Sequence, residues 1–171
     1  MKVVGLDLGG TKIAAGVFDG KRLLSKVVVP TPKEGGERVA EALAEAAERA
    51  EREAGVRGEA IGLGTPGPLD FRRGVIRFAP NIPGVQDFPI RRILEEATGR
   101  PVFLENDANA AALAEHHLGA AQGEESSLYL TVATGIGGGG VLGGRVLRGE
   151  RGQGGELGQL TLLPGGPACD C

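Results

Sequence analysis

The stretch Pro101-Val102-Phe103-Leu104-Glu105-Asn106-Asp107-Ala108-Asn109 decides how this chain folds and what it can do. Its first four residues form an apolar run of strand length, and the Ala-rich segment from Ala110 to Glu115 favours a helix. Asp107 would then lie in the first helical turn, beside free backbone N–H groups and the positive end of the helix dipole. That position suits a carboxylate that reaches a ligand at the carboxyl end of a sheet. Taken alone, the pattern favours the simpler alternative that Asn106 or Asp107 only caps the helix.

Charge and hydropathy exclude several classes of protein. The 171 residues carry 19 Lys and Arg against 22 Asp and Glu, a net charge of -3, without a basic or aromatic-plus-basic cluster. We therefore expect neither nucleic acid nor an anionic membrane as a partner. The sequence has no apolar run long enough to span a bilayer, and its N-terminal residues lack the features of a signal peptide. These observations predict a cytoplasmic protein, long enough for one domain with a core and short for two.

The spacing of apolar residues predicts a mixed α/β arrangement. Strands are expected over residues 3–8, 13–18, 23–29, 60–64 and 127–133, and helices over 37–54, 90–97 and 107–118. A hairpin or irregular strand is expected over 71–78, with short strands over 141–142, 145–147 and 160–163. The order of elements is typical of an N-terminal α/β lobe over residues 1–118. Residues 119–171 hold strands and glycine loops without covering helices, so we interpret them as the incomplete beginning of a second lobe.

The first candidate binding motif is Asp7-Leu8-Gly9-Gly10-Thr11-Lys12, where a carboxylate at a strand end is followed by a glycine turn. Glycines let backbone N–H groups approach a phosphate closely, while Thr11 adds a donor and Lys12 adds positive charge. The simpler alternative is an ordinary hairpin turn. Because four phosphate-compatible features fall within six residues, we favour contact with phosphate.

A second glycine loop is expected after the strand over 127–133. Seven of the 31 glycines fall between Gly135 and Gly144, and Gly135, Gly137 and Gly140 form a G-x-G-x-x-G pattern. In a dinucleotide-binding fold this pattern opens a helix. Here the following residues are typical of a strand and a turn, so we reject that interpretation. The G-x-x-x-x-G-K-[ST] phosphate loop is also absent from the sequence, which predicts a nucleotide site of another type.

Taken together, the motifs resemble the ROK family (repressor, open reading frame, kinase), and in particular its bacterial glucokinases. The matching segments are Asp7 to Lys12, Thr65-Pro66-Gly67-Pro68, Asn81, Glu105 to Asn109, Thr134 to Gly139 and Gly155-Glu156-Leu157-Gly158. The resemblance covers essentially the whole chain but little more than half of a typical member. It implies an actin-like ATPase (ribonuclease H-like) lobe with a mixed sheet and flanking helices. Sugar and ATP would meet in a cleft between this lobe and a second one.

The resemblance also implies roles for single residues. Asp107 would be the general base that takes the proton from the 6-hydroxyl of the sugar. Asp7 would face Mg-bound phosphates of ATP, whose path would be lined by Gly9, Gly10, Thr11, Lys12, Thr134, Gly135 and Gly137. Hydroxyls of the sugar would be bound by Gly67, Asn81, Asn106 and Glu156.

The chain departs from the family pattern at the zinc site. The family uses one His and three Cys to bind a structural zinc, but Gln159 stands at the His position. Cys169 and Cys171 are the only cysteines, and two thiolates with a glutamine are a poor zinc site. We expect this incomplete motif to hold no zinc. His116 and His117 are expected to be surface or packing residues rather than replacement ligands.

Two functions remain open at this point. The first is ATP-dependent phosphorylation of a hexose, most simply glucose, at its 6-hydroxyl by a shortened kinase chain. The second is a non-catalytic folded half of a ROK kinase. ROK repressors carry a DNA-binding motif ahead of the phosphate motif, and only six residues precede Asp7 here. Bare strands over residues 127–163 would expose apolar surface, so we predict self-association as a homodimer.

Overall fold

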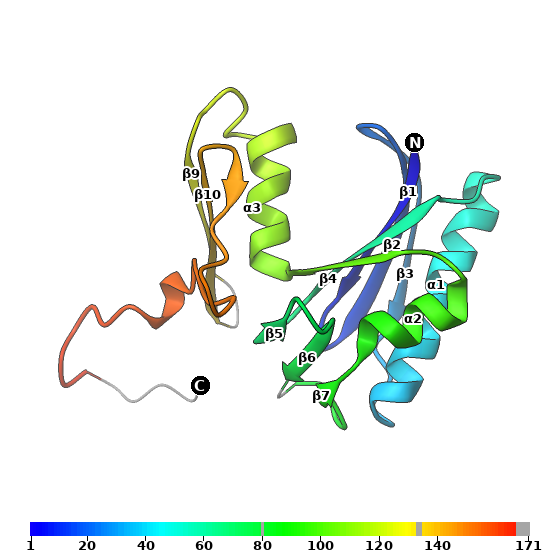
Figure 1. Ribbon diagram of the computed structural model, residues 1–171, viewed down its shortest axis with the longest axis horizontal. Helices are drawn as coiled ribbons and strands as arrows, with labels where there is room; N and C mark the ends of the chain where they lie inside the picture. The colour runs from blue at the N-terminus through cyan, green and yellow to red at the C-terminus, as the bar shows by residue number, and fades with distance from the viewer. Residues whose placement is uncertain (80, 133–134, 167–171) are drawn as a thin grey trace.

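A computed structural model describes residues 1–79, 81–132 and 135–166 (Figure 1). A five-stranded mixed sheet lies on one side of helix α3 (Asp107–Leu118), and a three-stranded glycine-rich sheet lies on the other. The expected α/β class is therefore confirmed. Within these ranges, no helix is both long and apolar enough to cross a membrane.

The five-stranded sheet places three candidate motifs at one edge. Its strands are β1 (Lys2–Leu8), β2 (Lys12–Asp19), β3 (Arg22–Pro30), β4 (Ala60–Thr65) and β8 (Val102–Asn106). They follow the order β3-β2-β1-β4-β8, in which β1 to β3 are antiparallel while β1, β4 and β8 run parallel. The carboxyl ends of parallel strands meet at the same edge of a sheet. Asp7, Thr65 and Asn106 stand at these ends.

Two helices, α1 (Gly36–Ala54) and α2 (Ile90–Thr98), cover one face of this sheet (Figure 1). The helix predicted over 37–54 is confirmed, and its apolar stripe of Val39, Leu43 and Ala47 is fully buried. Both helices end at a left-handed glycine, Gly55 with φ 67° and Gly99 with φ 68°. Glycine adopts this conformation without the steric cost of a Cβ atom.

The glycine-rich sheet packs against α3. It consists of β9 (Ser127–Val132), β10 (Ile136–Leu142) and β11 (Arg145–Val146) in the order β11-β10-β9, all antiparallel. A Cβ atom on Gly139 would lie only 2.6 Å from the carbonyl oxygen of Ala108. The run of glycines therefore lets the backbone of β10 approach the first turns of α3.

A third, small sheet follows the end of β4. Strands β5 (Leu69–Asp70), β6 (Val75–Phe78) and β7 (Gln86–Phe88) pair antiparallel in that order. The hairpin expected near residues 71–78 is present, whereas β7 was missed because its three residues carry no strand periodicity. A short 3-10 turn, Leu157–Gln159, lies near the end of the described chain.

Two predicted elements were wrong. Residues 136–140 were expected in a loop, but they pair with β9 from Ile136 to Val141. Tertiary pairing outweighs the low strand propensity of glycine at these positions. The strand expected over 160–163 is an irregular segment, in which Leu160, Leu162 and Leu163 are 64%, 90% and 70% exposed. An apolar alternation forms a strand only where a neighbouring strand accepts its hydrogen bonds.

The boundary between two lobes, expected at residue 118, stays a prediction.

Candidate active site

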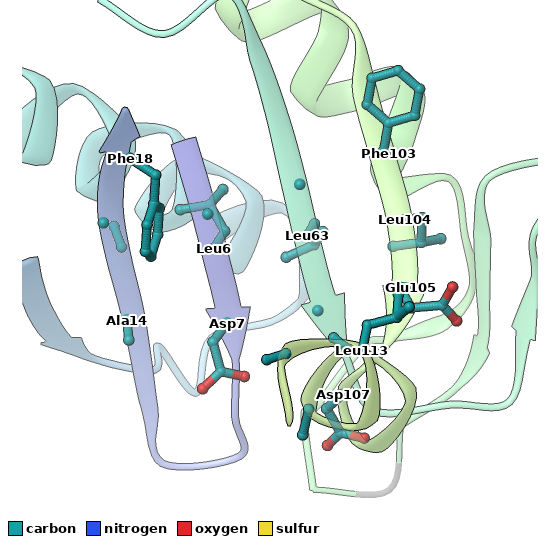
Figure 2. Close-up of a pocket in the computed structure, with 18 of the residues that line it drawn as sticks. Leu6, Asp7, Ala14, Phe18, Leu63, Phe103, Leu104, Glu105, Asp107 and Leu113 are labelled. Carbon is teal, nitrogen blue, oxygen red and sulfur yellow. The ribbon is translucent and has the colours of Figure 1, made fainter. Parts of the chain in front are cut away.

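The candidate catalytic residue Asp107 and the candidate metal-binding residue Asp7 lie close together. In the parallel register, Asp7 of β1 is opposite Gly64 of β4, and Gly64 is opposite Glu105 of β8. A Cβ atom on Gly64 would lie 3.9 Å from the Cα of Asp107. Figure 2 shows the Asp7 and Asp107 side chains at the same end of the strands. The absence of a side chain at Gly64 keeps the space between them open.

At the start of α3, the helix is capped by Asn106 and not by Asp107. Asn106 is the N-cap, with extended backbone angles of φ -65° and ψ 142°, and its Oδ1 accepts a hydrogen bond from the Asn109 N–H at 3.1 Å. The Asp107 Oδ1 accepts from the Ala108 N–H at 2.8 Å. Because Asn106 caps the helix, the capping alternative accounts for Asn106 and leaves the second Asp107 oxygen available for a ligand.

The pKa of Asp7 reports the electrostatics of the site. Burial raises the pKa of this carboxyl above its ordinary value, the negative charge of Asp107 raises it further, and the charge of Lys12 lowers it. Two carboxylates held this close favour a shared cation. A hard cation such as Mg²⁺ takes oxygen ligands and is usually held by one or two carboxylates together with substrate phosphates. Asp7 fits that role.

The turn Gly9-Gly10 is stabilised by hydrogen bonds from side chains of the segment that follows β3. The Thr31 hydroxyl donates to the Gly9 carbonyl oxygen at 2.7 Å, and the Lys33 ammonium donates to the Gly10 carbonyl oxygen at 2.5 Å. A Cβ atom on Gly10 would lie 2.9 Å from the Cβ of Asn81, so this glycine fits closely against the Asn81 loop. Thr31 and Lys33 were missed in the sequence, because they lie between the strand predicted over 23–29 and the helix predicted over 37–54.

Only some of the candidate sugar-binding residues have a described contact near the start of α3. A Cβ atom on Gly67 would lie 3.6 Å from Asn106 Nδ2, and Asn81 lies beside Gly10. Glu156 is exposed and follows Gly155, whose Cβ position lies 3.5 Å from Asn109 Oδ1. Gly67 and Gly155 therefore lie next to Asn106 and Asn109, whereas Asn81 contacts the Gly9-Gly10 turn.

The candidates on the second glycine segment are only partly placed. A Cβ atom on Gly137 would lie 3.9 Å from the Cβ of Ala108, in the first turn of α3. Gly135 has open space around its Cβ position, and no described contact joins it to the Gly9-Gly10 turn. Thr134 lies outside the described residues, as do Cys169 and Cys171 of the expected zinc motif. Among the described residues, no group of three or more His, Cys, Asp or Glu could hold a metal ion, so we assign no zinc site.

A groove of about 780 Å³ runs from the carboxylates along the face of the sheet opposite α1. Asp7, Glu105 and Asp107 lie at one end, and Phe18 and Phe103 lie at the other (Figure 2). The candidate sugar-binding residues do not line this groove. The polar site therefore lies at the rim of the groove, beyond the strand ends.

Glu105 was quoted in the sequence motif but given no role, and its partner Arg148 was missed entirely. The Glu105 Oε2 accepts hydrogen bonds from Arg148 Nε at 2.8 Å and Nη2 at 2.5 Å. The two residues are separated by 43 positions, too far for any periodic signal to connect them.

The mixed sheet, its flanking helices and the two neighbouring carboxylates define the class of protein, an α/β fold of the actin-like ATPase type. The chain belongs to the ROK family, whose family model matches residues 3–171. It is 41% identical over 178 residues to a glucokinase of Thermotoga maritima, covering 100% of this chain and 54% of that protein.

Solved structures agree with this assignment. The chain is similar to a ROK hexokinase from Thermus thermophilus, at 96% identity and a TM-score of 0.92, covering 100% of this chain and 57% of that one. It is also similar to a ROK family glucokinase from Streptomyces griseus in complex with glucose and AMPPNP. The two chains are 40% identical and superpose with a TM-score of 0.87, and the match covers 96% of this chain and 52% of the Streptomyces griseus chain. The chain thus spans about half the length of the relatives it matches.

Proposed function

We propose that this chain carries the base-bearing half of an ATP-dependent hexose kinase that acts on the 6-hydroxyl, with glucose as the first substrate to test. One observation carries the proposal. Asp107 lies in the first turn of α3 beside Asp7, while Asn106 performs the capping. The glucokinase relatives and the neighbour bound to glucose and AMPPNP support the choice of substrates.

In the proposed reaction, the Asp107 carboxylate takes the proton of the 6-hydroxyl as its oxygen attacks the γ-phosphorus of ATP. The bond from the γ-phosphorus to the bridging oxygen breaks, and that oxygen leaves with ADP. Mg²⁺ bound at Asp7 would neutralise charge on the phosphates. The protein otherwise contributes position, which is a large part of catalysis in phosphoryl transfer.

We assign the remaining candidates by the groups they offer. The backbone of Gly9, Gly10 and Thr11 and the charge of Lys12 would contact phosphates, and Thr134, Gly135 and Gly137 would also line their path. Gly67, Asn81, Asn106 and Glu156 would bind sugar hydroxyls, since such hydroxyls require polar groups of fixed direction. We place the reaction in the cytoplasm.

A coupled assay of the purified 171-residue chain with glucose, ATP and Mg²⁺ tests the proposal. Asp107→Asn keeps the size of the side chain but removes the base, so turnover should fall by about 100- to 10,000-fold. Asp19→Asn, at the exposed end of β2, is the matched control and should keep full activity. Equal rates in wild type and Asp107→Asn would exclude Asp107 as the base.

The second candidate function is a non-catalytic folded unit that self-associates as a homodimer. The outer face of β9 favours it, since Leu128, Leu130 and Val132 are 72%, 59% and 76% exposed. A row of exposed apolar side chains on a sheet is typical of a surface that another protein surface covers. A folded chain that shows no turnover would favour this candidate.

A further inference from the structure

The Glu105 carboxylate connects the start of α3 to a distant loop. Its Oε1 accepts hydrogen bonds from the Asn106 N–H at 3.0 Å and from Asn109 Nδ2 at 3.3 Å. Its Oε2 accepts both hydrogen bonds from Arg148. The Glu105 side chain is only 13% exposed, whereas that of Arg148 is 49% exposed. A charged pair that is half withdrawn from water and shares two hydrogen bonds holds its geometry better than an ordinary surface pair.

Arg148 begins the loop that leads to Glu156. Its backbone N–H donates to the Val146 carbonyl oxygen at 3.1 Å, and its own carbonyl oxygen accepts from the Gly154 N–H at 2.7 Å. Its guanidinium carbon also lies 5.4 Å from the centre of the Phe71 ring, in the turn between β5 and β6. One side chain therefore contacts both the strand-to-helix junction and the small sheet, while its backbone closes the loop 148–154.

The far end of this loop rests on the glycine-rich sheet and on α3. A Cβ atom on Gly155 would lie 3.2 Å from the Cα of Gly139 and 3.5 Å from Asn109 Oδ1. That Asn109 oxygen is buried and has no hydrogen-bond partner among the described residues. The loop therefore contacts the junction at both ends: Arg148 binds Glu105, and Gly155 lies against Asn109.

We propose that Glu105 and Arg148 are positioning residues that hold the Glu156 loop in register with Asn106 and Asp107. The inference rests on the proposed function, because it concerns how that site presents its sugar-binding groups. Glu105 immediately precedes Asn106 and Asp107, and Arg148 closes the loop that precedes Glu156. The pair therefore links two segments that would contact one hexose, the end of β8 and the loop that follows β11.

This role predicts a particular kinetic pattern. A more mobile loop should bind the hexose more weakly, while Asp107 and the Gly9-Gly10 turn keep their positions. Arg148→Gln should therefore raise the KM for glucose by about tenfold, the size expected for losing the charge-assisted hydrogen bonds of a half-exposed pair. The kcat and the KM for ATP should change by less than about threefold. Arg148→Lys keeps the charge without the forked donor geometry and should restore part of the affinity.

Hydrogen exchange measured by mass spectrometry, together with calorimetric titration of glucose, tests the inference. In Arg148→Gln, amides of residues 149–157 should exchange faster and glucose should bind about tenfold more weakly. Arg151→Gln, an exposed residue of the same loop, is the matched control and should change neither. Glu105→Gln should reproduce the effect, and the double variant should be no worse than either single one, as expected for a coupled pair.

Failure of the proposed function can be distinguished from failure of the positioning role of Glu105 and Arg148. A wild-type chain that binds no glucose would contradict the proposed function, and the exchange comparison would still decide whether the pair holds the loop. Unchanged exchange over 149–157 in Arg148→Gln, or an equal change in Arg151→Gln, would overturn the inference. Thermal unfolding of each variant shows whether it is folded, and Arg148→Lys provides the comparison if Arg148→Gln is not.

Discussion

Asp7 at the end of β1 lies close enough to Asp107 at the start of α3 for their carboxylates to interact. Burial raises the pKa of Asp7, and the Asp107 charge adds to that effect. Two acidic side chains cannot form an attractive ion pair with each other, so their proximity does not stabilise the fold. Such an arrangement is typical of a site in which function, rather than stability, selects the residues.

Removing the Asp7 charge should stabilise the fold in a pH-dependent way. The pKa of Asp7 is raised in the folded state above its ordinary value of 3.8, so the folded chain binds this proton more tightly than the unfolded chain. Stability is therefore lost as the pH rises from the ordinary pKa through the raised one. Asp7→Asn should increase the free energy of unfolding at pH 7 by less than about 1 kcal/mol, since the Asp7 side chain is exposed and its charge is screened by solvent.

Urea denaturation of wild type and Asp7→Asn at pH 3 and pH 7 checks this expectation. The two proteins should differ at pH 7 and agree at pH 3, where Asp7 is protonated in both states. Asp19→Asn should show no difference at either pH. A gain of equal size at both pH values would show that the effect does not come from ionisation.

The buried ion pair between Arg100 and Glu51 should contribute strongly to stability. The two side chains are 8% and 11% exposed, and Glu51 Oε1 also accepts a hydrogen bond from the Gly58 N–H at 2.6 Å. Arg100→Met leaves the Glu51 charge buried without its counter-charge, so the free energy of unfolding should fall by about 3 kcal/mol.

The matched control for this pair is Arg92→Met, which breaks an exposed pair with Glu96 on α2. It should cost less than about 0.5 kcal/mol. Urea midpoints with unchanged slopes measure both differences. Similar costs for the two variants would contradict the assignment of the Arg100 pair as the stronger one.

Gly139 should be the least replaceable glycine of β10. A Cβ atom there would lie 2.6 Å from the Ala108 carbonyl oxygen and 2.9 Å from the Cβ of Ala112. Gly139→Ala should cost about 1–3 kcal/mol of stability, because α3 must move away from the sheet. Gly62→Ala on β4 is the control, since nothing lies within 4 Å of its Cβ position. Thermal unfolding compares the two, and an equal loss in both would argue against the close approach.

Self-association should depend on the outer face of β9. Leu130→Lys places a charge in the exposed apolar row and should shift the chain from a dimer to a monomer in light scattering after size-exclusion chromatography. Leu162→Lys changes a residue that is 90% exposed in the irregular C-terminal segment and should leave the dimer intact. A monomeric wild type at high concentration would exclude the predicted homodimer.

Local patterns predicted much of the first lobe. The apolar stripe of α1, its end at Gly55 and the junction at Asn106 could all be predicted from a few neighbouring residues. Sequence reasoning was less successful in β10, where four consecutive glycines (137–140) with little strand propensity pair because β9 lies beside them. It also missed Lys33, whose link to Gly10 spans 23 positions.

By itself, the sequence determined the strand-to-helix junction at residues 101–109 and the kinds of chemical group placed there, because capping and periodicity act over a few residues. Only the tertiary structure decided which groups face one another. The closeness of Asp7 and Asp107 depends on the parallel pairing of β1, β4 and β8. The link between Glu105 and Arg148 depends on how the glycine-rich sheet packs on α3. Pairing and packing join residues that are distant in the chain, and no local pattern records them.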